Sequence, residues 1–147
     1  MNGTEPPRGL VEARDLYEDL LRNSSEMDLS DEVYYNLAWI YVRLGDTAEA
    51  EEYFKIVIDE THDEVLKISA LCRLADTYLE SGRLEEAREV YDQVLEDYPK
   101  NFYADYAQYQ LGNTLLELGR LDAALLSYQS LPVNFPDSHF QDEAIYR

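Results

Sequence analysis

The chain has 147 residues, of which 46% are hydrophobic, so it can form one domain but is short for two. Its 31 acidic and 12 basic residues give a formal charge of −19, which argues against nucleic acid or an anionic membrane as a partner. A neutral or basic protein or peptide is favoured, and no direct membrane insertion is expected because no apolar run approaches about 18 residues.

The chain is expected to begin with a disordered lead-in, residues 1–7, which contains Gly3 and two prolines and few apolar residues. From Gly9 to about Arg22 the apolar residues fall at helical spacing. This spacing predicts the first helix, which is followed by a polar connection.

The next helix is predicted over residues 30–44, and Gly45 should end it by adopting a left-handed conformation. Asp46 and Glu49 have the spacing of a capping box. They predict that a third helix starts there and continues to about residue 59.

Thr61 and Glu64 repeat the capping-box spacing, so we expect a helix from about His62 to Ser81. The helix after it should end at Tyr98, because Pro99 cannot continue a helix.

Two further helices are predicted over residues 101–118 and 121–130, the second ended early by Pro132. Gly112 lies in the middle of the first of them, where it costs about 1 kcal/mol of helix propensity. Since Ala38 and Ala75 stand at the matching points, this position should need a small residue at a close helix crossing.

Residues 37 positions apart are alike along most of the chain. The matching sets include Ala13, Ala50, Ala87 and Ala124; Tyr17, Phe54, Tyr91 and Tyr128; Leu37, Leu74 and Leu111; and Gly45, Gly82 and Gly119. One two-helix unit is therefore copied along the chain.

One copy of the unit has its characteristic residues at Leu71, Leu74, Ala75, Tyr78, Gly82, Ala87, Tyr91, Val94 and Pro99. This pattern resembles the tetratricopeptide repeat (TPR) family, with HEAT and Sel1-like repeats as the competing assignment. The resemblance implies an all-α, TPR-type superhelix (solenoid) of about eight antiparallel helices. The implied divisions are a partial repeat at 8–30, repeats at 31–67, 68–104 and 105–141, and a truncated repeat at 142–147.

The junction from Tyr98 to Gly112 and its echo from Phe135 to Arg147 resemble a subclass of bacterial envelope TPR proteins. Examples of the subclass are the Tol-Pal-associated cell-division coordinator and the TPR lipoprotein of the outer-membrane assembly machine. The resemblance implies an envelope context, and both a periplasmic and a cytoplasmic location stay open.

No catalytic constellation is recognisable in the sequence. His62 and His139 have no Cys or second His at ligand spacing, so a metal site is not expected. Cys72 has no His base in the repeat register, and the glycines recur as turn residues without forming a phosphate loop. We therefore predict a protein that is not an enzyme and binds no cofactor.

The TPR resemblance implies that the first helices of the repeats line a concave peptide-binding groove. Transferred to this chain, the groove comprises Tyr35, Asn36, Trp39, Arg43, Arg73, Asp76, Tyr106, Tyr109, Gln110 and Asn113. Aromatic rings beside amide side chains suit a peptide or helix, although several rings can instead pack between helices.

The sequence therefore predicts a protein-interaction scaffold that binds a partner peptide or helix. The alternative is a structural module that associates head to tail. In that case the C-terminal segment of one molecule completes the half-repeat at the head of the next, and such a contact need not close into a ring.

Overall fold

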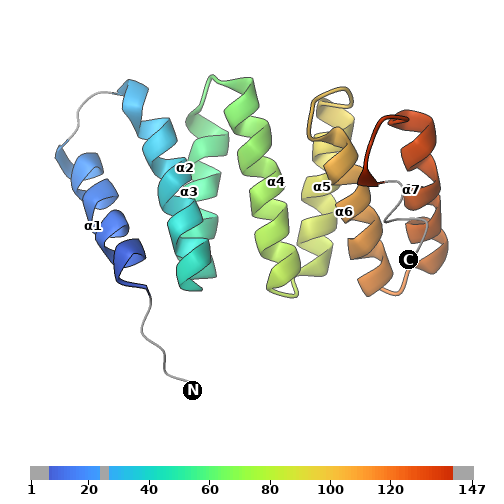
Figure 1. Cartoon of the computed structure of the whole chain (residues 1–147), viewed down its shortest axis with the longest axis horizontal. Helices are drawn as coiled ribbons and strands as arrows, with labels where there is room; N and C mark the ends of the chain where they lie inside the picture. The colour runs from blue at the N-terminus through green and yellow to red at the C-terminus, as the bar shows by residue number, and fades with distance from the viewer. Residues whose placement is uncertain (1–6, 24–26, 141–147) are drawn as a thin grey trace, which may run out of the picture. The chain divides into compact units, whose positions relative to one another are not determined.

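A computed structural model of the chain describes residues 7–23 and 27–140 (Figure 1). These residues form seven helices and no strand: α1 (Arg8–Asn23), α2 (Met27–Leu44), α3 (Thr47–Glu60), α4 (Glu64–Glu80), α5 (Leu84–Asp97), α6 (Ala104–Glu117) and α7 (Leu121–Asn134). The all-α prediction is confirmed, and the described ranges contain seven of the about eight helices predicted for the whole chain. The predicted truncated repeat, residues 142–147, and the predicted lead-in, apart from Pro7, lie outside the described residues.

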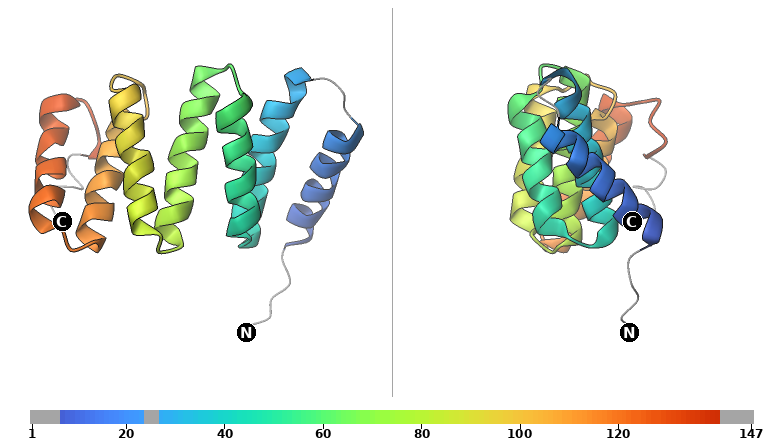
Figure 2. Two further views of the ribbon diagram at one scale, coloured as in Figure 1. Left: turned by 180° about the vertical axis from the view of Figure 1, so that it is seen from behind. Right: turned by 90° about the vertical axis from the view of Figure 1, so that its left-hand side faces the viewer.

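The chain divides into two compact units, residues 1–70 and 71–147, with the boundary inside α4. In unit 1, α2 packs against both α1 and α3; in unit 2, α6 packs against both α5 and α7 (Figure 2). None of the helices in the described ranges is both long and apolar enough to cross a membrane.

The buried residues follow the 37-residue register. On the second helix of each repeat an Ala and an aromatic ring are buried: Ala50 with Phe54 in α3, Ala87 with Tyr91 in α5, and Ala124 with Tyr128 in α7. The small Ala lets the paired helices approach, and the ring four residues later fills the space between them. The residues that repeat every 37 positions thus form the buried face of these helices.

The turns between paired helices depend on glycine. Gly82 has a φ of +79°, the Gly82 amide donates to the Leu79 carbonyl at 3.1 Å, and the Arg83 amide donates to the Tyr78 carbonyl at 2.8 Å. A left-handed residue followed by this long backward bond is a Schellman motif, and glycine adopts its conformation without strain. The same turn recurs at Gly45 and Gly119.

The two predicted capping boxes have different outcomes. Asp46 caps α3 by accepting a hydrogen bond from the Glu49 amide at 3.5 Å. The prediction for α4 is wrong, because Asp63 rather than Thr61 accepts from the first free amides, those of Val65 at 3.0 Å and of Leu66 at 3.3 Å. As a result, α4 begins at Glu64 and not near His62.

The N-terminus of α6 lies three residues later than predicted. The Asn101 side chain accepts a hydrogen bond from the Tyr103 amide at 2.6 Å and donates to the Tyr98 carbonyl. This local ring holds the chain in a turn, so the helix begins only at Ala104.

The prediction that Pro132 ends α7 early is also wrong, since the helix continues to Asn134 with Pro132 inside it. Proline lacks the amide that would reach the Tyr128 carbonyl, but it leaves the following donors intact. The Phe135 amide donates to the Leu131 carbonyl at 2.7 Å and completes the last turn.

The predicted close crossing at Gly112 is confirmed. A Cβ atom at Gly112 would lie 2.5 Å from Cε1 and 2.7 Å from Cδ1 of Tyr128. The ring of Tyr128 therefore occupies the space that an alanine side chain would need.

Candidate peptide-binding surface

Five predicted groove residues of unit 2 meet where α4 and α6 face each other. Arg73 and Asp76 are three residues apart on α4, and Tyr106, Gln110 and Asn113 follow one another on α6 at helical spacing. With Tyr91 of α5 they form one hydrogen-bonded set, which we call the Asp76 network.

Asp76 is the centre of this network. Its carboxylate pairs with Arg73 Nη1 at 2.9 Å and accepts a hydrogen bond from the Tyr106 hydroxyl at 2.8 Å. It also accepts from the Tyr91 hydroxyl and, at 3.5 Å, from the Gln110 amide. With four donors around two oxygens, Asp76 holds its neighbours in place and has little remaining capacity to accept from a ligand.

The network continues along α6 toward α7. Gln110 donates to the Tyr106 hydroxyl at 3.2 Å and accepts from the Asn113 amide at 2.8 Å. Asn113 in turn accepts from the Tyr128 hydroxyl at 2.5 Å. The two amide side chains are therefore oriented by hydrogen bonds at both ends and present a fixed polar row.

The environment keeps the tyrosine hydroxyls protonated. Burial and then the negative charge of Asp76 raise the pKa of Tyr91 and of Tyr106 above the usual value for tyrosine. Burial alone would lower the pKa of Arg73, but Asp76 and Tyr103 raise it overall. The cluster is thus a charged pair surrounded by neutral donors over the physiological pH range.

Aromatic rings border the network. The Arg73 guanidinium lies 5.6 Å from the ring centroid of Tyr106 and 5.7 Å from that of Tyr103. Sequence reasoning did not place Tyr103 at the site, although its position three residues before Tyr106 puts both on one side of α6.

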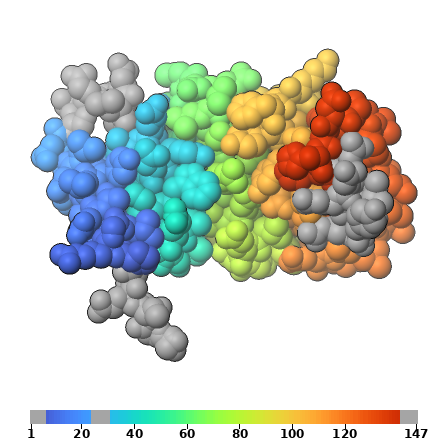
Figure 3. All heavy atoms as spheres, in the orientation of Figure 1, coloured from blue at the N-terminus to red at the C-terminus, as the bar shows by residue number. Residues whose placement is uncertain are grey.

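Tyr109 has a different environment from the other α6 residues. It is only 5% exposed, and its ring stacks on that of Phe140 at 5.1 Å and lies 6.2 Å from that of Tyr128. In the space-filling view the red segment after α7 lies against the orange atoms of α6 (Figure 3). Tyr109 therefore packs inside unit 2, which leaves Tyr106, Gln110 and Asn113 as the half-buried residues of this row.

The other four predicted groove residues lie on α2 in unit 1. Asn36 donates to the Tyr17 hydroxyl at 3.3 Å, and the Tyr35 ring contacts the Phe54 ring edge-on at 5.9 Å. Trp39 is half-buried and Arg43 is exposed.

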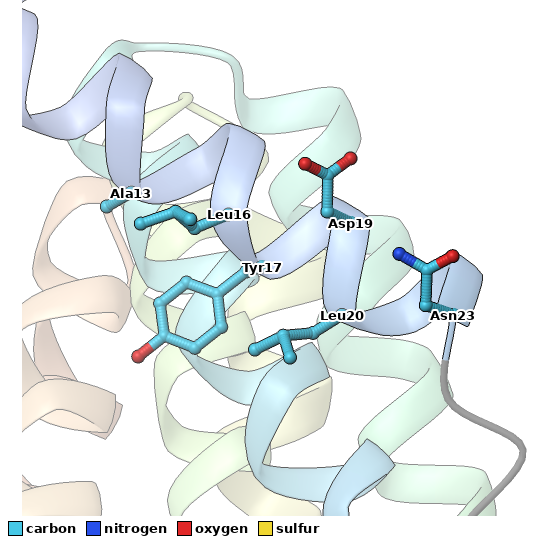
Figure 4. Close-up of a pocket in the computed structure, with 6 residues that line it drawn as sticks. All are labelled: Ala13, Leu16, Tyr17, Asp19, Leu20 and Asn23. Carbon is cyan, nitrogen blue, oxygen red and sulfur yellow. The ribbon is translucent and has the colours of Figure 1, made fainter.

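Unit 1 also has an open depression on α1, with a volume of about 560 Å³. Figure 4 shows the residues that line it: Ala13, Leu16, Tyr17, Asp19, Leu20 and Asn23. No residue of α1 is buried, and Leu16 and Leu20 are 66% and 52% exposed. The Val57 position of α3, which matches Leu20 in the repeat register, is fully buried.

The described residues offer little for catalysis or metal binding. Cys72 is fully buried, and burial raises the pKa of its thiol to about 12, so it is a poor nucleophile. The described ranges contain no group of three or more His, Cys, Asp or Glu residues arranged to hold a metal ion. The arrangement suits recognition, by a fixed row of amides and rings.

Paired antiparallel helices copied at 37 residues place the chain in the class of α-helical repeat proteins. Two family models, both described as tetratricopeptide repeat, match residues 72–139 and residues 31–59, together about two thirds of the chain. The chain belongs to the tetratricopeptide repeat family, whose proteins generally act as non-enzymatic scaffolds for protein–protein interaction.

Solved structures agree on the fold. A tetratricopeptide repeat protein from Parabacteroides merdae matches 92% of this chain with a TM-score of 0.78 and 21% identity, and the chain spans 51% of that protein. MamA matches 93% of this chain with a TM-score of 0.67 and 17% identity, and the match covers 83% of MamA. PilF of Pseudomonas aeruginosa matches 94% of this chain with a TM-score of 0.61 and 18% identity, and the match covers 60% of PilF. A comparison with curated proteins finds no match.

Proposed function

We propose that the protein is a non-enzymatic scaffold that binds a peptide or helix of a partner protein on the exposed side of the Asp76 network. The observation that supports this proposal most directly is the row of Tyr106, Gln110 and Asn113 on α6, which hydrogen bonds hold in one orientation. A fixed row loses little conformational entropy on binding, and amides can satisfy the polar groups of a peptide backbone.

The charge of the chain indicates the chemistry of the partner. A formal charge of −19 favours a neutral or basic peptide over an acidic one. The ring faces of Tyr103 and Tyr106 already attract the Arg73 guanidinium, and they provide similar contacts for Arg or Lys side chains of a ligand. Binding should therefore weaken as the salt concentration rises.

The test begins with a peptide selected from a random display library on the full chain. Its dissociation constant is then measured by calorimetry for the wild type and for Gln110→Ala and Asn113→Ala. We expect each substitution to weaken binding about tenfold, because each removes a fixed amide at the contact.

The matched control is Gln93→Ala, which removes an exposed amide from α5. It should leave the dissociation constant unchanged, and circular dichroism should show equal helicity for all variants. Equal affinities of the Gln110, Asn113 and Gln93 variants would contradict the proposal.

Trp39 reports separately on the predicted α2 part of the groove, because it is the single tryptophan of the sequence and is half-buried. If a peptide also contacts Tyr35, Asn36 or Arg43, the tryptophan emission should shift on binding. If the emission stays unchanged while Asn113→Ala still weakens peptide binding, the binding surface is restricted to unit 2.

Head-to-tail self-association is the second candidate function. It is supported by α1, on which Leu16 and Leu20 are exposed, whereas the residues that match Leu20 in the other second helices, Val57, Val94 and Leu131, are buried. Another molecule's C-terminal segment would cover this face. Growth of the sedimentation coefficient with concentration, removed by Leu16→Glu with Leu20→Glu, is the expected result. A wild type that stays monomeric would contradict it.

The sequence resemblance suggests a bacterial envelope context, and a periplasmic and a cytoplasmic location both stay open. Fractionation of the source cells, followed by immunodetection of the protein, distinguishes the two. Recovery with the cytoplasmic fraction would contradict the envelope context.

A further inference from the structure

A small pocket lies at the end of unit 2 where α6 begins. It has a volume of about 310 Å³ and is formed by the start of α6, the turn before α6 and the turn after α7, which lie together at the top of Figure 1. Its lining includes the apolar Phe102, Phe135 and Pro136 and the acidic Asp105 and Asp137. A volume at the lower end of the range for ligand pockets suits a single side chain.

Two matching turns hold the backbone around this pocket. The Asn101 amide donates to the Tyr98 carbonyl at 3.2 Å, and 37 residues later the Ser138 amide donates to the Phe135 carbonyl at 3.0 Å. The Asn101 and Ser138 side chains each accept from the amide two residues further on, at 2.6 Å and 3.1 Å. The walls of the pocket are therefore fixed by hydrogen bonds of their own.

The two carboxylates of the pocket have no basic partner among the described residues. Asp105 accepts a hydrogen bond from the Tyr106 amide at 2.8 Å, which is favourable at the start of a helix but leaves its second oxygen available. None of the ion pairs in the described ranges uses Asp105 or Asp137, and no Lys or Arg lines the pocket. The pocket can therefore accept hydrogen bonds from a cation.

The repeat itself does not require these carboxylates. One repeat earlier, Ile68 stands at the position of Asp105 and Lys100 at that of Asp137. Ile68 is only 2% exposed, so the position of Asp105 accepts a buried apolar side chain in the same register. The acidic pair is thus a property of this pocket and not of the fold.

An aromatic ring beside the carboxylates faces water. Phe102 is 61% exposed, and its ring centroid lies 4.6 Å from that of Tyr103. The face of an exposed ring attracts a cation, and its apolar surface can contact the methylene groups of a long side chain. The lining of the pocket therefore suits a side chain that is apolar along its length and positive at its end.

A similar combination of groups already holds an arginine elsewhere in unit 2. The Arg73 guanidinium pairs with Asp76 at 2.9 Å and lies 5.6 Å and 5.7 Å from the ring centroids of Tyr106 and Tyr103. A planar guanidinium can pair with a carboxylate and stack on a ring at the same time, which the ammonium group of lysine does less well. The pocket offers carboxylates and rings of the same kind to a guanidinium from outside the chain.

We propose that this pocket binds an arginine side chain of a partner protein, with the guanidinium paired to Asp105 and Asp137 and the methylene groups against Phe102. The formal charge of −19 attracts a basic partner to the whole molecule, whereas the pocket determines where one of its arginines docks. The pocket shares no residue with the Asp76 network, so this site does not depend on peptide binding there.

The test is a titration of the full chain with acetyl-arginine amide, followed through the NMR signals of the backbone amides. The amides of Phe102, Asp105 and Asp137 should shift, with a dissociation constant of about 1 mM at about 0.15 M salt. Acetyl-citrulline amide, the neutral isostere, should bind at least about tenfold more weakly, because it cannot form an ion pair.

Free arginine is a further probe, which separates a partner's side chain from a free amino acid. It should bind more weakly than the capped probe, because the two aspartates repel its own carboxylate. Tighter binding of free arginine would identify a pocket for an amino acid and overturn the proposal.

The variant that tests the pocket is Asp105→Asn with Asp137→Asn, which removes both charges, nearly preserves side-chain volume and keeps an acceptor for the Tyr106 amide. It should weaken binding of the arginine probe at least about tenfold. Phe102→Ala should also weaken it, because the ring face is lost.

The matched control is Glu89→Gln with Glu96→Gln, which removes the same charge from a depression on α5 that no aromatic ring lines. It should change the dissociation constant less than about twofold. Equal weakening by the two double variants would show that only the net charge matters and overturn the proposal. So would equal affinity for the citrulline probe, or the absence of shifts at the amides of the pocket.

Discussion

In the α4–α5 pair the buried hydroxyl of Tyr91 donates to a carboxylate, that of Asp76. In the α6–α7 pair the equivalent hydroxyl, that of Tyr128, donates to an amide, that of Asn113. Both donors sit on the second helix and both acceptors on the first, 37 residues apart. The repeat therefore preserves a tyrosine hydrogen bond across each pair while the charge of its acceptor changes.

The two pairs also differ at the crossing point and on the outside. Ala75 stands where α6 has Gly112, against which the Tyr128 ring packs. The outer side is charged on α5 and apolar on α7. The comparison shows that a common packing of helices can have different acceptors and outer surfaces, because only the inner positions are constrained by volume.

The largest expected difference between the pairs follows from removing the acceptor. Asp76→Ala should lower the free energy of unfolding by about 3 kcal/mol, because it leaves Arg73 and two tyrosine hydroxyls without their shared partner. Asn113→Ala should cost about 1 kcal/mol, since the groups it leaves are neutral. Urea unfolding monitored by circular dichroism measures both, and equal losses would refute the special role of the carboxylate.

At the crossing point, Gly112→Ala should destabilise the chain by about 2 kcal/mol, even though alanine is the better helix former. The new Cβ would lie 2.5 Å from the Tyr128 ring, which has to move and strain its bond to Asn113. Thermal unfolding gives the measurement. The control is Gly9→Ala in α1, where no atom lies within 4 Å of the added Cβ and a small gain is expected.

Substituting phenylalanine for each tyrosine removes the hydroxyl alone and compares the two hydrogen bonds directly. Tyr91→Phe should cost about 1.5 kcal/mol, because hydrogen bonds to a charged acceptor are the stronger ones. Tyr128→Phe should cost about 1 kcal/mol or less. The two free energies come from the same urea titration, and a larger loss for Tyr128→Phe would show that charge is not the deciding factor.

The smallest expected effect is a loss of stability at alkaline pH. Burial and then Asp76 raise the pKa of Tyr91 and Tyr106 above 10.0, and burial raises the pKa of Cys72 from 9.0 to about 12. The folded chain thus holds these protons more tightly than the unfolded chain. The protonated side chains therefore contribute fully to the free energy of unfolding below pH 9, and this contribution declines as the pH rises above 9 to 10. The melting temperature of the wild type should fall between pH 8 and pH 11. The melting temperature of the Tyr91→Phe variant should fall less steeply, because this variant lacks one of the titrating hydroxyls. Parallel curves would contradict the assignment.

Much of the fold could be predicted from the sequence because its determinants are local or repeated. Gly82 and its equivalents end helices through their own backbone conformation, and Ala87 and its equivalents mark the inner face. Helix ends were predicted less well. Thr61 accepts from the amide of Asp63, whereas Asp63 accepts from the amide of Val65 at the start of α4. Which of the two side chains caps the helix depends on local geometry that the spacing of residues does not contain.

The candidate site stays a prediction, although its residues lie near one another. The TPR resemblance assigned Arg73, Asp76, Tyr106, Gln110 and Asn113 to one groove, and in the structure hydrogen bonds connect these five side chains. The sequence could not show that the carboxylate is surrounded by donors, because these come from three helices.

By itself, the sequence determined the repeat, its period, its glycine turns and the small residues at helix crossings, since each is fixed by backbone conformation or by side-chain volume. Only the tertiary structure decided that Tyr109 packs beneath Phe140, that Asp76 orders its neighbours, and that the apolar residues of α7 face water. These features depend on which side chains from separate helices fill the same space, and a linear pattern does not specify that contact.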